Sequence, residues 1–393
     1  MPATAVDRPS PGPTEAGRPL KAQVAAIIGT RPEAIKLAPV VRELGASTTL
    51  SPRLVATAQH RDLLDQVLRH FGLTPDVDLD LMQPGQTLAD LTARAVTGLT
   101  SVLEVEAPAM VMVQGDTTTA MTGALAAFYL GIPVAHVEAG LRSGDIRNPF
   151  PEEVNRRIIS QLATLHLAPT EGNRSRLISE GVAPGAIVVT GNPGIDAVLS
   201  VAESGVGEPE LLAAVPELDE GDRRLVLVTL HRRESFGEPL EKICGTLARL
   251  AREIPGLVFL LPMHPNPAVR GTIRSLLGNV PGFHLTEPLS YAPFVAAMTR
   301  ATLILSDSGG VQEEAPSLNT PVLVLRDATE RPEVIDVGAA ALVGRDPRDI
   351  HALATRLLTD EAARLEMTGK RNPFGDGNAS VRIREAIEAY LAR

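Results

Sequence analysis

The sequence contains one cysteine, Cys244, among 393 residues. A single thiol cannot form a disulfide within the chain, and it cannot supply the thiolates that a multi-cysteine metal site needs. No spacing among the histidines resembles a zinc-ligand motif. We therefore expect a protein of a reducing, cytoplasmic compartment without a bound metal ion.

The sequence also lacks a long apolar run. No segment approaches the ~20 residues that span a bilayer, and residues 1–20, which are rich in Pro, Gly, Ala and Thr, lack the apolar stretch of a secretion signal. The formal net charge of −10 argues against nucleic acid or an anionic membrane as the main partner, because both select clustered positive charge. We expect a soluble protein that begins with a disordered tail over residues 1–20.

The length of the chain predicts more than one domain, because a single hydrophobic core rarely serves 393 residues. Short apolar runs alternate with longer amphipathic segments, a pattern typical of βαβ units around a mostly parallel sheet. The pattern weakens once, in a stretch rich in Glu, Gly and Pro. We predict a doubly wound α/β domain at residues 21–203, a linker at 204–222, a second such domain at 223–375 and, within 376–393, a helix that returns to the first domain.

The apolar runs define the predicted strands. They cover residues 24–28, 54–57, 110–113, 134–137, 165–167 and 187–189 in the first domain, and 225–230, 258–261, 283–285, 303–305 and 322–325 in the second. Because crossovers between parallel strands are almost always right-handed, the intervening helices should cover both faces of each sheet.

Three carboxylates follow predicted strands of the first domain: Asp116, Glu138 and Glu152. In open α/β sheets the ligand crevice lies beyond the carboxyl ends of the strands. Acids delivered there by successive βα units can converge on one small molecule. The alternative is that they are ordinary, solvated residues at strand ends.

The turn after the first predicted strand has one glycine, Gly29, where a dinucleotide-binding fingerprint has three. A hydride-transfer cofactor therefore has no support. The turn carries Arg31, and Lys36 follows about one helical turn later. Cations near a helix N-terminus oppose the macrodipole unless they meet an anion, so these two residues either bind an anion in the crevice or are ordinary surface groups.

A second anion site is indicated where Ser308, Gly309 and Gly310 begin a helix after a predicted strand. Unsatisfied backbone N–H groups at a helix start bind phosphate, and glycines permit its close approach. A helix that is merely capped by serine is the alternative. Glu314, about one turn further, could accept both hydroxyls of a ribose, and Arg331 could add positive charge near the phosphates.

Two histidines follow strands of the second domain. His231 comes directly after the strand at 225–230, where a group that titrates near neutrality could protonate or hydrogen-bond a leaving phosphate. The surrounding His-Arg-Arg-Glu sequence could instead form a structural ion-pair network. His264 occupies the corresponding place one strand later, where it could contact a base or a phosphate.

Taken together, these segments resemble the non-hydrolysing UDP-N-acetylglucosamine 2-epimerase family, from residue 23 to the C-terminus. The resemblance is carried by residues 29–36, 59–61, 114–117, 136–142, 151–156, 231–234, 306–316 and 326–333. It implies the glycosyltransferase-B architecture, in which two Rossmann-like domains surround a cleft. It also implies a homodimer that needs no cofactor.

The reaction implied by the resemblance is the reversible conversion of UDP-N-acetylglucosamine to UDP-N-acetylmannosamine by inversion at C2. The family eliminates UDP across C1 and C2 to give 2-acetamidoglucal, protonates the opposite face and adds UDP back. Opposite faces need separate proton donors and acceptors, and charge that develops at C1 needs stabilisation. No nicotinamide, flavin or metal ion is required.

The resemblance also assigns roles to individual residues. The expected catalytic groups are Asp116, Glu138, Glu152 and His231, the last of them at the diphosphate leaving group. The expected ligands of substrate or UDP are Arg31, Lys36, Arg156, His264, Phe294, Ser308, Gly309, Gly310, Glu314 and Arg331. Arg156, one turn beyond Glu152, is expected to hold that acid ionised.

Gln59, His60 and Arg61 match a segment associated with an activating second molecule of UDP-N-acetylglucosamine in bacterial members of the family. Three other functions stay open. A glycosyltransferase of the same fold would need an acceptor pocket, a hydrolysing epimerase would release free N-acetylmannosamine, and a non-catalytic sugar-nucleotide sensor would need only the ligands of the second domain. Three acids grouped in the first domain favour proton transfer at the sugar itself.

Overall fold

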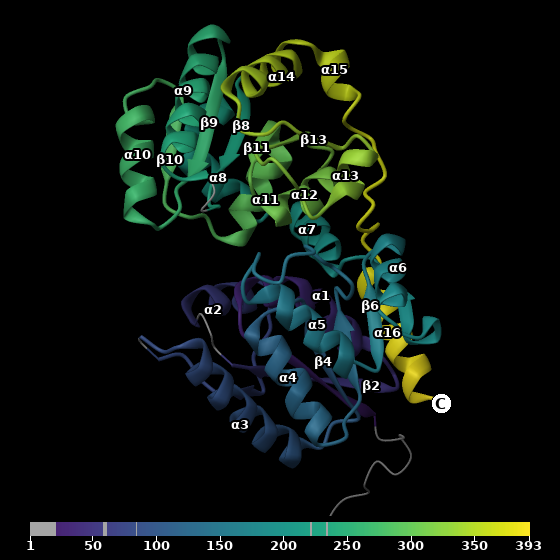
Figure 1. Cartoon of the computed structure of the whole chain (residues 1–393). Coiled ribbons are helices and arrows are strands. Elements are labelled where there is room, and N and C mark those ends of the chain that lie inside the picture. Colours follow the sequence, from purple (N-terminus) through teal and green to yellow (C-terminus); the bar gives the residue numbers. More distant parts are fainter. Residues whose placement is uncertain (1–20, 58–60, 84, 221, 233–234) are drawn as a thin grey trace, which may run out of the picture.

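The computed structural model describes residues 21–57, 61–83, 85–220, 222–232 and 235–393. The first domain is built on a seven-stranded parallel sheet with the order β3-β2-β1-β4-β5-β6-β7 (Figure 1). Its strands are β1 (Ala22–Ile28), β2 (Leu50–Ala56), β3 (Val77–Asp78), β4 (Met110–Gln114), β5 (Val134–Val137), β6 (Leu165–Ala168) and β7 (Ile187–Val189). Its helices are α1 (Arg31–Ala46), α2 (Arg61–His70), α3 (Leu88–Glu106), α4 (Thr118–Tyr129), α5 (Glu152–Leu162), α6 (Glu171–Ser179) and α7 (Pro193–Ser204).

Helices cover both faces of this sheet, as predicted. Successive side chains of a strand point to opposite faces, and in β1 Val24 and Ala26 join one buried apolar cluster while Ala25 and Ile27 join another. Because both faces are buried, the strand reads as a continuous apolar run.

The second domain repeats the arrangement around a six-stranded parallel sheet with the order β10-β9-β8-β11-β12-β13. Its strands are β8 (Arg224–Thr229), β9 (Leu257–Pro262), β10 (Phe283–Thr286), β11 (Ala301–Ser306), β12 (Val322–Val324) and β13 (Ala340–Leu342). Its helices are α9 (Glu238–Glu253), α10 (Pro267–Leu277), α11 (Tyr291–Arg300), α12 (Gly309–Glu314), α13 (Pro332–Asp336), α14 (Pro347–Thr359) and α15 (Glu361–Leu365).

The strand order of each sheet reverses once, between β1 and β4 in the first and between β8 and β11 in the second. Such switch points leave a crevice at the carboxyl ends of the strands, where ligands of doubly wound domains bind. Residues that follow β1 and residues that follow β8 line the same cavity, so the two crevices face each other. The two domains therefore form the predicted glycosyltransferase-B-like architecture.

The predicted linker at 204–222 contains two short helices, α8 (Glu208–Ala214) and η2 (Pro216–Asp219). α8 packs against α11, and α7, which lies between the domains in Figure 1, packs against both α11 and α12. One buried apolar cluster continues from Ile195 and Leu211 to Val295. The junction is thus a packed contact, while the exact domain limits stay predictions.

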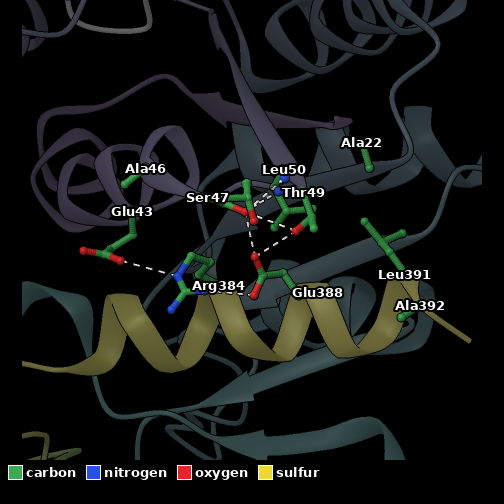
Figure 2. A pocket seen from close by; sticks show the side chains of 11 residues that line it. Ala22, Glu43, Ala46, Ser47, Thr49, Leu50, Arg384, Glu388, Leu391 and Ala392 are labelled. Carbon is green, nitrogen blue, oxygen red and sulfur yellow. Dashed lines mark hydrogen bonds and ion pairs between the residues drawn. The ribbon is translucent and has the colours of Figure 1, made fainter. Parts of the chain in front are cut away.

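The last helix, α16 (Ala379–Leu391), packs on α1, α7 and β6 of the first domain (Figure 1). Figure 2 shows how it is held beside a cavity of about 670 Å³. The Glu388 carboxylate accepts hydrogen bonds from the hydroxyls of Ser47 (2.6 Å) and Thr49 (2.9 Å), and Arg384 lies 3.5 Å from Glu43 on α1. None of the described helices is long and apolar enough to cross a membrane.

The packing at the junction can be tested at Gly207, where α8 begins. A Cβ atom at this position would lie 2.1 Å from the carbonyl oxygen of Ala292 on α11. We expect Gly207→Ala to lower the free energy of unfolding by about 1–3 kcal/mol, because the helices must separate to admit a methyl group. The matched control is Gly245→Ala within α9, where a Cβ meets nothing within 4 Å, and it should raise that free energy by up to ~1 kcal/mol. Urea denaturation measures both, and equal stabilities would contradict the packing.

Candidate active site

The turn between β1 and α1 is fixed by a buried carboxylate. Glu33 accepts hydrogen bonds from the backbone N–H groups of Gly29 (2.9 Å) and Thr30 (2.7 Å), and from the Thr117 hydroxyl (2.6 Å) in the turn after β4. Thr30 and Glu33 form a capping box, which explains why α1 begins at Arg31. Glu33 thus ties the turn before Arg31 to the turn that carries Asp116.

Glu138 lies directly after β5 with 5% of its side chain exposed. Its carboxylate accepts hydrogen bonds from Lys36 Nζ (2.5 Å), from Asn192 Nδ2 (3.3 Å) and from the Gln114 amide. Its φ of 67° is in the left-handed region, where a residue with a Cβ is strained. Burial raises the pKa of Glu138, the Lys36 ammonium opposes that shift, and the balance stays above the ordinary value. A carboxyl of this kind can accept and return a proton.

Asp116 and Glu152 are linked through α5. The Asp116 carboxylate pairs with Arg156 at 2.5 Å, and its backbone carbonyl accepts from Asn155 at 2.9 Å. Glu152 is the first residue of α5, and one of its carboxylate oxygens is buried without a hydrogen-bond partner in the described part of the chain. That oxygen is an acceptor which a ligand can use.

The expectation that Arg156 holds Glu152 ionised is wrong. Arg156 instead pairs with Asp116 and, at 3.0 Å, with Glu153. Glu153 is fully buried, and a buried carboxylate requires a cation close by. The spacing along α5 predicts that Arg156 lies near Glu152. It does not show that Glu153 is the more deeply buried carboxylate and therefore the one that needs the cation.

His136 supports this group of acids from inside β5. Its imidazole is buried, and Nε2–H donates to the backbone carbonyl of Gly115 at 2.8 Å, directly before Asp116. Burial lowers the pKa of His136 to about 3. The ring is therefore neutral, and its tautomer follows from the carbonyl, which can only accept.

In the second domain, His231 is oriented by Asp307. The two residues follow the neighbouring strands β8 and β11. The Asp307 carboxylate is fully buried and accepts from the backbone N–H groups of His231 (3.0 Å) and Arg232 (3.0 Å), while His231 Nδ1 lies 2.9 Å away. Burial alone would raise the pKa of Asp307, but the hydrogen bond from His231 and its neighbours lower it below the ordinary value. Nδ1 thus faces Asp307, and His231 also lines a cavity.

That cavity has a volume of about 280 Å³ and is lined by both domains. Arg31 enters from the first domain and donates to the backbone carbonyl of Leu289 at 3.4 Å. The predicted ligands that line the cavity are Arg31, His231, His264, Phe294 and Ser308. The rest of the lining is mostly apolar, so a few polar groups stand in an apolar wall, as is typical of sites for small molecules.

The start of α12 differs from a simple serine cap. Ser308 occupies the N-cap position, but its side chain makes no capping hydrogen bond. A Cβ at Gly309 would lie 2.6 Å from a guanidinium nitrogen of Arg331. Glycine at 309 thus lets the Arg331 cation lie against the helix start, next to Gly310. The alternative of a merely capped helix loses its main support.

Two adjacent glutamates of α12 have different surroundings. Burial raises the pKa of Glu314 to about 8, Glu313 adds to this shift, and Lys36 and Arg31 oppose it. Glu313 accepts from Arg331 Nε at 2.5 Å and from Asn192 Nδ2 at 2.9 Å, and it lies 3.8 Å from Lys36 Nζ. Of these two glutamates, only Glu314 has a role predicted from the sequence.

The remaining predicted residues were those of the activator segment. Gln59 and His60 lie outside the described residues, and Arg61 begins α2. Across the ranges that the structure describes, no group of three or more His, Cys, Asp or Glu side chains could hold a metal ion.

Comparisons with known proteins show which family the chain resembles. The family model described as UDP-N-acetylglucosamine 2-epimerase matches residues 42–388. A UDP-N-acetylglucosamine 2-epimerase of Yersinia pestis is 48% identical over 372 residues, covering 94% of this chain and 99% of that protein. One of Escherichia coli K12 is 48% identical over 370 residues, covering 93% and 98%. The crystal structure of the Neisseria meningitidis UDP-GlcNAc 2-epimerase bound to UDP-GlcNAc has a TM-score of 0.88 and 44% identity, covering 94% of this chain and all of that one.

The neutral state of His136 predicts a dependence of stability on pH. Its pKa is about 6.5 when unfolded and about 3 when folded, so the unfolded chain binds more protons between these values. Stability therefore falls as the pH drops below about 6.5, by about 2 kcal/mol for this residue between pH 7.5 and pH 5. His136→Gln keeps a donor for Gly115 but does not titrate, so its loss of stability in urea over this interval should be smaller by that amount. An identical loss in both proteins would show that His136 is charged in the folded state.

Proposed function

The chain belongs to the UDP-N-acetylglucosamine 2-epimerase family, and from this we infer that it interconverts UDP-N-acetylglucosamine and UDP-N-acetylmannosamine as an isomerase. The observation that carries the inference is the placement of Glu138, a buried carboxyl with a raised pKa, beside cations of both domains, Lys36 and Arg331. Cytoplasmic activity is proposed because the chain has a single cysteine.

In the proposed complex, UDP occupies the cavity that both domains line, most of it formed by the second. His264 and Phe294 border the base, Glu314 accepts the ribose hydroxyls, and the diphosphate meets Ser308, Gly309 and Gly310 together with Arg31, Lys36 and Arg331. The hexose then extends toward the first domain and its three acids. This placement is supported by the cavity lining and by the position of Arg331 at the start of α12.

The proposed reaction is an elimination followed by an addition. A carboxylate takes the C2 proton while the C1–O bond breaks, and the electron pair of that bond leaves with UDP to give 2-acetamidoglucal. His231, oriented by Asp307, hydrogen-bonds the leaving diphosphate. A second acid protonates the opposite face of C2, and UDP adds back at C1. Asp116, Glu138 and Glu152 supply the donors and acceptors for the two faces.

The direct test is incubation with UDP-N-acetylglucosamine in deuterium oxide. We expect both UDP-sugars to carry deuterium at C2, because the proton taken from one face exchanges with solvent before the other face is protonated. Mass spectrometry and NMR measure the label. An unlabelled product, or free hexosamine with UDP, would assign the chain to a transferase or a hydrolysing enzyme.

Variants separate the acids from the fold. Asp116→Asn, Glu138→Gln and Glu152→Gln should each lower kcat by about 10²–10⁴-fold, because each removes a proton donor or acceptor. Glu171→Gln, on an exposed side chain at the start of α6, is the matched control and should retain the wild-type rate. Wild-type turnover in all three acid variants would refute the assignment.

We also propose a homodimer. Three large apolar side chains, Val105, Phe128 and Tyr129, are exposed at the ends of α3 and α4, which pack side by side. Exposed apolar patches commonly mark protein interfaces. Sedimentation should give twice the mass of one chain, with Phe128→Glu shifting the protein toward the monomer.

A second molecule of UDP-N-acetylglucosamine is proposed as an activator beside the active site. The support is the resemblance at residues 59–61. Rates should then depend sigmoidally on UDP-N-acetylglucosamine, and the reverse reaction should need a trace of it. Hyperbolic kinetics in both directions would exclude activation.

A further inference from the structure

Glu313 belongs to the second domain, but two of its three side-chain partners belong to the first. Only 3% of its side chain is exposed. Its carboxylate accepts from Asn192 Nδ2 and lies near Lys36 Nζ, both from the first domain, while Arg331 of its own domain donates to the other oxygen. An ionised group so deeply buried is stable only with such partners.

The same two residues of the first domain also bind Glu138. Lys36 Nζ lies 2.5 Å from Glu138 and 3.8 Å from Glu313, and Asn192 Nδ2 lies 3.3 Å from Glu138 and 2.9 Å from Glu313. The Lys36 ammonium has three N–H donors and the Asn192 amide has two, so each can serve both carboxylates at once.

The orientation of the Asn192 side chain is not ambiguous. Its Oδ1 accepts from the backbone N–H of Gly194 at 2.9 Å, as the N-cap of α7. The amide N–H groups must therefore point toward Glu138 and Glu313. Hydrogen bonds to the backbone also hold Glu313 and Asn192 in place. Asn372 donates to the Glu313 carbonyl (2.7 Å), and the Asn192 N–H donates to the Phe374 carbonyl (2.6 Å).

We propose that Glu313 is a positioning residue for Glu138, which it controls across the domain junction by holding Lys36 and Asn192 in the orientation in which they donate to the Glu138 carboxylate. This rests on the proposed function. Its consequence is that the proton-transferring carboxyl has its full set of partners only while the domains are packed together. Opening of the junction separates Glu313 from Lys36 and Asn192, and proton transfer then stops before a reactive glycal meets bulk water.

The charges around Glu138 predict in which direction its pKa moves when the charge of Glu313 is removed. The charged groups that face it are Lys36 on α1, Asp116 after β4, Glu313 on α12 and Arg331 before α13. Burial raises the pKa of Glu138, and Glu313 is among the groups that raise it further. Removal of the Glu313 charge leaves two cations with fewer anions, so Glu138 becomes a weaker base.

The test compares kcat, KM and the pH profile of kcat in four variants. Glu313→Gln should lower kcat by about 10-fold or more, change KM by less than about 3-fold, and move the limb of the profile that reports Glu138 toward lower pH by about one unit. Glu313→Asp keeps the charge and should restore part of kcat and the wild-type limb. Asn192→Ser keeps an N-cap for α7 but removes the bridging amide, so it should also lower kcat.

Glu333→Gln is the matched control. Glu333 is another carboxylate of the second domain that touches the first, where it accepts from the Thr170 hydroxyl at 3.4 Å. Among the residues that the structure describes, its side chain forms no hydrogen bond or ion pair with Lys36, Asn192 or Glu138. It should keep the wild-type kcat and profile. The proposal is overturned if Glu313→Gln retains kcat, if it changes only KM with an unshifted profile, or if Glu333→Gln reproduces its effect.

Failure of the proposed function gives a different result. If the wild-type chain forms no C2-labelled UDP-sugar in deuterium oxide, the epimerase assignment itself is wrong. If the wild type epimerises and Glu313→Gln does so equally well, only the role of Glu313 is wrong. If Glu313→Gln does not fold, the kcat of Asn192→Ser tests the same link between Glu313 and Glu138.

Discussion

The rest of the site depends on four charged side chains that meet at the domain junction, two buried carboxylates and two largely buried cations. Each buried ion costs several kcal/mol unless an opposite charge lies close to it. Lys36 and Glu138 come from the first domain, and Glu313 and Arg331 come from the second. The set is neutral as a whole, and Lys36 is linked to both carboxylates. The packing of the domains and the chemistry of the acids therefore cannot be separated.

The folding of each domain explains why these groups meet. A doubly wound sheet collects the residues that follow its central strands at one edge, and the chain uses this edge twice. Lys36 and Glu138 follow β1 and β5, and Glu313 follows β11. Inward-facing helices complete the junction, because α7 packs against α11 and α12 and its N-cap, Asn192, reaches both carboxylates. Local sequence patterns in each domain thus lead to one cluster of charged side chains that both domains supply.

Local patterns in the sequence predicted the local parts of this structure. Each predicted strand is present, with bounds that agree to within four residues, because apolar runs in a sheet buried on both faces are distinctive. β3 and β13 were not predicted. β3 spans two residues, and β13 begins with two alanines and lies partly exposed at the edge of its sheet, so neither forms a distinct apolar run. The partners of the site residues could not be predicted from local sequence. Asp307 meets His231 only because β11 lies beside β8, and Glu313 is separated from Lys36 by most of the length of the chain. Spacing on α5 even suggested the wrong carboxylate for Arg156.

The return of α16 to the first domain restricts how one domain can move against the other. The backbone passes between the domains once on the way to β8 and again before α16, whose end is fastened to α1 and to Ser47. A body joined to another at one point can swivel in any direction, whereas two points of attachment leave essentially one axis of rotation. Any rotation of one domain against the other would therefore be confined to an axis through the two crossings, and closure would return Glu313 to Lys36 and Asn192 along the same path.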